Sequence, residues 1–151
     1  MNSTVIVAVL GLLTTLAAAG FTSYMQRQSQ RESRVFEARV VGYGELVSAL
    51  YDYERATYSR VKARLEGRAD VDRESLRQEA WSSNAKARAA IGVVALLSGR
   101  ADLHTRFDAV RRSVGDLNQA TNVSDLRAQY DSINVELADV IVQAKADVTR
   151  P

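Results

Sequence analysis

The chain has 151 residues, the length of one domain, and a formal net charge of +2 at neutral pH. Hydrophobic residues make up 46% and charged residues 25%, a balance that is typical of a folded protein and excludes a wholly disordered one. The absence of cysteine excludes a disulfide framework and a thiolate metal site. The net charge is too small to indicate a nucleic-acid partner.

The N-terminal segment is the most distinctive part of the sequence. Residues 1–26 contain no Asp, Glu, Lys, Arg or His, and the stretch from Thr4 to Tyr24 has the length that a helix needs to cross a bilayer. We therefore predict a transmembrane anchor over residues 1–24, with Tyr24 at the membrane interface. A basic stalk over residues 25–36 follows, in which three arginines share one helical face and could meet anionic lipid headgroups: Arg27, Arg31 and Arg34.

Two other interpretations of this segment remain. Ala17, Ala18 and Ala19 have the small-residue form of a signal-peptide cleavage site, so the alternative is a protein secreted after cleavage near Ala19. The segment before the apolar run has no basic residue, which a signal peptide would need, and arginines crowd just after it. A buried helix of a soluble protein is the third interpretation. For the anchor, the positive-inside rule predicts a single pass through the inner membrane, with the N-terminus outside and the C-terminal domain cytoplasmic.

Small residues recur within the predicted anchor. They could let two spans pack closely, although such residues are common in membrane segments. The stripe consists of Ala8, Gly11, Thr15 and Ala19.

The remaining sequence shows helical periodicity and no strand pattern. The first helix is expected to run from about Thr4 to Glu66 and to end at Gly67, and Asp72 is expected to cap the second, which ends at Ser98. The third spans about 100–119 and the fourth about 124–149. Apolar residues at spacings of three and four predict the core face of the first helix: Phe36, Val40, Tyr43, Val47, Leu50, Thr57 and Val61.

The short connections between these helices favour antiparallel neighbours. The predicted fold is therefore all-α: an N-terminal transmembrane helix that continues into an antiparallel up-down-up-down four-helix bundle over residues 37–151. Gly42 and Gly44 lie within the first helix, and close packing against a neighbour is the preferred explanation for them.

The order of these parts resembles a group of single-pass membrane proteins from actinobacteria and their phages. The resemblance rests on the apolar span, the arginines, "RVVGYGELVSALYDY", "AIGVVALLSGRADLHTRFDAV" and a final amphipathic helix. It covers nearly the whole chain as a pattern of composition and order, without a diagnostic motif. It implies a span, a basic stalk and a helical domain, and it implies no catalytic residues.

The residues offer no catalytic constellation. His104 is the sole histidine and is expected at the surface, because the second histidine and the Glu-x-x-His motif of a bundle metal site are missing. Glu54 interrupts an apolar stripe; it is either a buried acid or, as we expect, an edge residue paired with an arginine. We predict no enzyme, no cofactor, no metal site and no small-molecule substrate.

Tyr51 and Tyr58 lie seven residues apart and so share a helical face. They could form an exposed strip for a partner helix, or they could widen the buried face of the first helix.

Three functions remain open. The first is a non-enzymatic membrane-anchored scaffold or adaptor that binds a protein partner or self-assembles at the inner face of the membrane. The alternatives are a small membrane-active effector, phage- or toxin-like, which assembles through its transmembrane helix, and a bundle that senses a ligand in the small-residue middle of its second helix.

Overall fold

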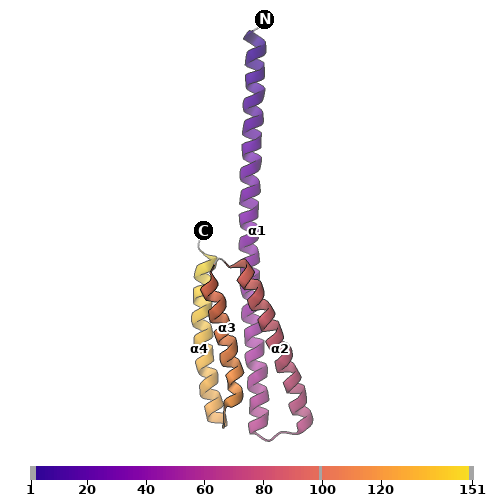
Figure 1. Ribbon diagram of the computed structural model, residues 1–151, viewed down its shortest axis with the longest axis vertical. Coiled ribbons are helices and arrows are strands. Elements are labelled where there is room, and N and C mark those ends of the chain that lie inside the picture. The colour runs from indigo at the N-terminus through magenta and orange to yellow at the C-terminus, as the bar shows by residue number, and fades with distance from the viewer. Residues whose placement is uncertain (1–2, 99, 150–151) are drawn as a thin grey trace. The chain divides into compact units, whose positions relative to one another are not determined.

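The structure is a computed structural model that describes the backbone of residues 3–98 and 100–149 and the side chains of residues 30–69, 72–98 and 100–149. The elements are α1 (Ser3–Leu65), α2 (Asp70–Leu97), α3 (Ala101–Asp116), a short 3-10 helix η1 (Leu117–Gln119) and α4 (Val123–Val148) (Figure 1). No strand occurs over the described backbone. The predicted all-α class is confirmed.

The chain divides into two compact units, residues 1–37 and 38–151. In the first unit, every described side chain from 30 to 37 is exposed to solvent. Within the part of the chain that the structure describes, no helix is both long and apolar enough to cross a membrane. The predicted anchor, residues 1–24, lies outside the described side chains and stays a prediction.

Residues 38–151 form a bundle of four helices around one core. Along the chain α2 packs on α3 and α3 on α4, and successive helices run in opposite directions (Figure 1). The largest fully buried side chains come from all four helices and from η1; they include Leu46, Leu50, Val94, Leu103, Phe107, Leu117, Leu126 and Leu137. Burial of these side chains supplies the main favourable free energy of folding. The predicted helical bundle is confirmed.

Local sequence signals fix two of the helix ends. Gly67 has a φ of +67°, the left-handed conformation that ends a helix with least strain when the residue is glycine. At the start of α4, the Asn122 side chain accepts a hydrogen bond of 2.8 Å from the Asp125 backbone N–H. The Asp125 carboxylate in turn accepts one of 3.1 Å from the Thr121 N–H, which completes a reciprocal cap.

Two local predictions were wrong. Asp72 does not cap α2, because the helix already begins at Asp70 after the extended residue Ala69, so Asp72 lies in its first turn. Phe36 and Val40 do not belong to the core: they are 50% and 45% exposed. Phe36 belongs to the first unit, and Val40 borders an open groove between α1 and α4, so the buried part of the α1 stripe begins at Tyr43.

Gly42 lets α1 and α2 approach each other near the end of α2. Four alanines of these helices are also buried: Ala56 and Ala63 on α1 and Ala80 and Ala87 on α2. A Cβ atom added to Gly42 would lie 3.1 Å from Cδ1 of Leu97, so this glycine permits the close approach that the sequence predicts. Gly44 has no atom within 4 Å of such a Cβ, and close packing does not explain it.

We expect Ala87→Leu to destabilise the bundle by about 1–3 kcal/mol, because a larger side chain at a fully buried position overpacks the core. Urea denaturation of the purified chain, followed by far-UV circular dichroism, measures this change. Ala85→Leu on the exposed face of the same helix is the matched control and should change the free energy of unfolding by less than about 0.5 kcal/mol. Equal effects of the two substitutions would contradict the packing.

Candidate functional site

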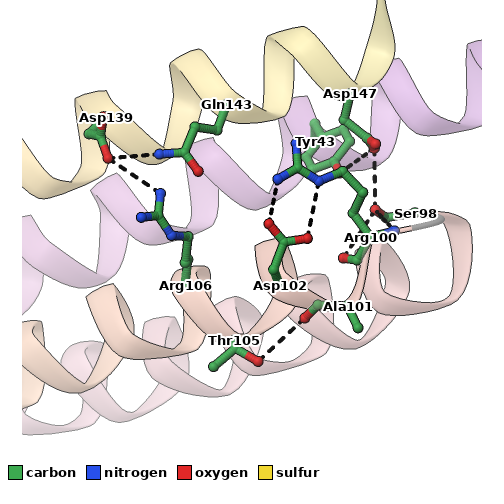
Figure 2. Close-up of polar contacts among 10 residues, drawn as sticks. All are labelled: Tyr43, Ser98, Arg100, Ala101, Asp102, Thr105, Arg106, Asp139, Gln143 and Asp147. Atoms are coloured by element: carbon green, nitrogen blue, oxygen red, sulfur yellow. Dashed lines mark hydrogen bonds and ion pairs between the residues drawn. The ribbon is translucent and has the colours of Figure 1, made fainter. Parts of the chain in front are cut away.

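A buried polar cluster joins three segments at the end of the bundle where α2 leads into α3. The Tyr43 hydroxyl donates a hydrogen bond of 2.9 Å to Oδ2 of Asp147, and the Ser98 hydroxyl donates one of 3.2 Å to the same oxygen (Figure 2). The Arg100 backbone N–H donates to Ser98 Oγ at 3.0 Å. Burial and then the hydrogen bond to Asp147 raise the pKa of the Tyr43 hydroxyl, which keeps it a neutral donor.

This cluster holds the α2–α3 connection against α1 and α4. Arg39 adds a hydrogen bond of 2.7 Å from its Nε to the Leu97 carbonyl, one of the carbonyls that the end of α2 leaves without an intrahelical partner. Sequence reasoning missed Asp147, although it follows Val140 by seven residues and therefore shares its buried face. The hydrogen-bonded carboxylate gives this end of the bundle one defined arrangement.

An apolar groove lies between α1 and α4 beside the cluster. Its volume is about 340 Å³. The groove accounts for Gly44, whose missing side chain leaves it open. It is lined by Val40, Tyr43, Gly44 and Val47 from α1 and by Ile141, Ala144, Lys145, Val148 and Thr149 from α4.

The last third of α2 exposes apolar residues on its outer face. Residues 89–97 read AAIGVVALL and contain no charge on any side. Ile91 and Val94 are buried in the core, whereas Val93 is 45% and Leu96 is 88% exposed. Exposed apolar residues that cluster in this way mark interaction sites more often than single ones do. We call Ala89, Gly92, Val93, Ala95 and Leu96 the α2 patch.

Glu54 is a buried acid with an unsatisfied oxygen. Glu54 is 1% exposed to solvent, and its side-chain oxygen Oε1 has no hydrogen-bond partner. The expected pairing with an arginine at the edge of the stripe is therefore wrong, and the buried alternative holds. Burial raises the pKa of the Glu54 carboxyl from 4.5 to about 7, because the charged form loses its hydration.

The two tyrosines of the predicted partner strip have different surroundings. Tyr51 is 43% exposed. Tyr58 is partly buried and packs on Tyr130 of α4, with ring centroids 4.8 Å apart. The two side chains therefore do not form one exposed strip, and Tyr58 contributes to the packing between α1 and α4.

The other predicted residues are distributed over both units. Arg31 and Arg34 are exposed, as contact with lipid headgroups would require. Tyr24, Arg27 and the stripe of Ala8, Gly11, Thr15 and Ala19 lie outside the described side chains. His104 is exposed on α3, as predicted. In the middle of α2, Ala80, Ser83 and Ala87 are buried in the bundle, and the sensing hypothesis stays a prediction.

Comparison with known proteins adds one match, which covers the bundle. Residues 40–148 match the model of a family described as KilB plasmid transfer protein. The chain belongs to the KilB family. No curated protein and no solved structure matches the chain.

The residues that match the KilB family are almost the same as those of the second compact unit. The family model begins at Val40 and ends at Val148, and the second unit begins at Ala38. The family match therefore covers the four-helix bundle of this chain, including the polar cluster, the groove and the α2 patch.

We expect the stability of the bundle to fall as pH rises from about 4.5 to above 7, relative to a Glu54→Gln variant. The folded state binds the Glu54 proton more tightly than the unfolded state, so raising the pH through this window favours unfolding. The shift corresponds to a growing advantage of the variant of about 3 kcal/mol. Urea denaturation of both proteins at pH 4.5, 6 and 8 measures it. A difference that does not vary with pH would contradict a buried, unpaired carboxyl.

Proposed function

We propose that this chain is a non-enzymatic, membrane-anchored helical adaptor that supports plasmid transfer by binding a protein partner or a second copy of itself at the inner face of the membrane. The observation that carries the proposal is the α2 patch, with Leu96 almost fully exposed at the end of an uncharged run. The KilB family is described as plasmid transfer proteins, which supplies the process.

The physical argument is the hydrophobic effect at the α2 patch. Burial of apolar surface is favourable by about 25 cal/mol per Å², so covering Leu96 and Val93 with a complementary surface stabilises a complex. A helix that only had to pack on α1 and α3 would need apolar residues on its inner face alone. The uncharged outer face of residues 89–97 supports contact with another protein.

The sequence before the bundle supports anchoring. Residues 1–26 are uncharged over a length that spans a bilayer, and the arginines at 27, 31 and 34 follow directly. An anchor would confine the bundle to a layer beside the membrane, which raises its local concentration toward membrane-bound partners.

The proposal predicts that Leu96→Glu abolishes complex formation without unfolding the bundle. Leu96 contributes almost no buried area to the fold, whereas a carboxylate at this point would have to be desolvated in a complex. Chemical crosslinking in membranes of plasmid-bearing cells, followed by affinity purification, measures capture. We expect the wild-type chain to capture a specific partner or its own copy and Leu96→Glu to lose at least about 90% of the product.

Gln78→Glu is the matched control, because it introduces the same charge at an exposed position of the same helix, away from the α2 patch. It should retain the crosslinked product. A product that forms equally with Leu96→Glu would count against this surface as the site of contact.

Anchoring has a test of its own. Because the chain has no cysteine, Ser75→Cys and Ser132→Cys each introduce one labelling site at an exposed position of the bundle. We expect a membrane-impermeant maleimide to label both variants only after lysis, with the chain in the membrane fraction and its N-terminal residues present by mass spectrometry. Labelling in intact cells would reverse the topology, and a mass that lacks residues 1–19 would show a cleaved signal.

A further inference from the structure

The groove between α1 and α4 is lined by apolar side chains of both helices. On α4, Ala144 is buried in the core, and Ile141 and Val148 are partly buried and pack against it. On α1, Val40 is 45% exposed, and a Cβ atom added to Gly44 would have no atom within 4 Å. The α1 side of the groove is therefore open, and a ligand that covers this apolar surface gains the free energy of removing it from water.

Two polar side chains of the lining already have hydrogen-bond partners within the protein. The Tyr43 hydroxyl donates to Asp147 at 2.9 Å, so the part of Tyr43 that is left for a ligand is its ring (Figure 2). The Thr149 hydroxyl donates to the backbone carbonyl of Lys145 at 3.0 Å. A ligand in the groove therefore needs an apolar body, because hydroxyl or amide groups along its length would lose their hydration without finding free donors.

Lys145 gives the groove its charge. It lies in the last turn of α4, it is exposed, and it is the only charged residue among the described residues of the lining. A lysine places its alkyl stem along apolar surface and keeps the ammonium group in water, so the positive charge lies at the edge of the groove. The Asp147 carboxylate is not part of the lining; it is buried and accepts hydrogen bonds from Tyr43 and Ser98. An apolar groove with a cation at its edge is complementary to an apolar chain that ends in an anion.

The size of the groove restricts the ligand further. Its volume of about 340 Å³ lies at the lower end of the range for small-molecule sites, so it suits one acyl chain and not the two chains of a phospholipid. On α1 the lining runs only from Val40 to Val47, about two turns, which is shorter than an average helix of a protein partner. Lysine is a compact point charge without the fork of donors with which arginine matches a phosphate group, and a single carboxylate suits it.

We propose that the groove between α1 and α4 binds a free fatty acid of medium chain length, with the acyl chain between the helices and the carboxylate paired with Lys145. The site shares no residue with the α2 patch, so the proposal is independent of the adaptor function.

A series of fatty acids tests the apolar part of the site. The full chain is held in an amphipathic polymer, because detergent monomers would compete for the groove, and is titrated by calorimetry with octanoate, decanoate and dodecanoate. We expect one dodecanoate to bind per chain, with saturation below about 0.1 mM. The affinity should rise about tenfold with each two added methylene groups, because each methylene contributes to the apolar area that is buried.

Substitutions of Lys145 test the recognition of the anion. Lys145→Gln should weaken dodecanoate binding about tenfold through loss of a charge-assisted contact. Lys145→Glu should reverse the preference of the site, so that dodecyltrimethylammonium binds more tightly than dodecanoate, whereas the wild-type chain prefers dodecanoate. A folding defect would weaken both ligands and cannot reverse their order.

Two glycines provide a matched pair of variants for the apolar part. Gly44 and Gly92 both lie within helices and both have no atom within 4 Å of an added Cβ, so leucine at either position improves helix propensity without a clash. Only Gly44 lines the groove. Gly44→Leu should therefore weaken dodecanoate binding at least about tenfold, and Gly92→Leu should change it less than about twofold. The Gly92→Leu protein also corrects for partition of the fatty acid into the polymer.

Three results would overturn the proposal. The first is the absence of saturable binding of dodecanoate at one molecule per chain. The second is equal binding of dodecanoate by Gly44→Leu and Gly92→Leu, which would place the ligand elsewhere. The third is retention of dioleoyl phosphatidylglycerol by the purified chain in mass spectrometry with no retention of dodecanoate, which would make the ligand a membrane lipid.

Discussion

The close approach of α1 and α2 at Gly42 is the constraint on which this end of the bundle depends. A Cβ atom at position 42 would lie 3.1 Å from Cδ1 of Leu97, so a larger residue there would push the two helices apart. The large side chains of the core come from all four helices. Leu97 packs against Gly42, whereas its neighbour Leu96 is 88% exposed on the outer face of α2.

The same contact sets the register of the two helices. Gly42 lies against Leu97, and the Leu97 carbonyl accepts a hydrogen bond of 2.7 Å from Nε of Arg39, three residues before Gly42. The buried carboxylate of Asp147 then ties the α2–α3 connection to α1 and α4. The bundle of this KilB family member thus presents an apolar surface near the end of α2.

The sequence predicted the positions of the helices well, and the burial and partners of individual side chains less well. Gly67 and the Thr121–Asp125 turn are local signals, so the ends they fix follow from sequence alone. The prediction that Asp72 caps α2 was wrong, because an acidic residue in the first turn of a helix cannot be distinguished from an acidic cap by sequence alone. Phe36 and Glu54 failed for a tertiary reason: periodicity gives the face of a residue, but not whether another helix reaches that face. Asp147 was missed because its partners Tyr43 and Ser98 come from segments far away in the sequence.

The measurement that tests the account most directly is the frequency of plasmid transfer between cells that carry Leu96→Glu. The variant protein should reach the wild-type level in the membrane fraction, because Leu96 does not support the fold. If the bundle serves plasmid transfer through the α2 patch, transfer falls at least about tenfold with Leu96→Glu and is retained with Gln78→Glu. Undiminished transfer with Leu96→Glu at equal protein level would contradict the account.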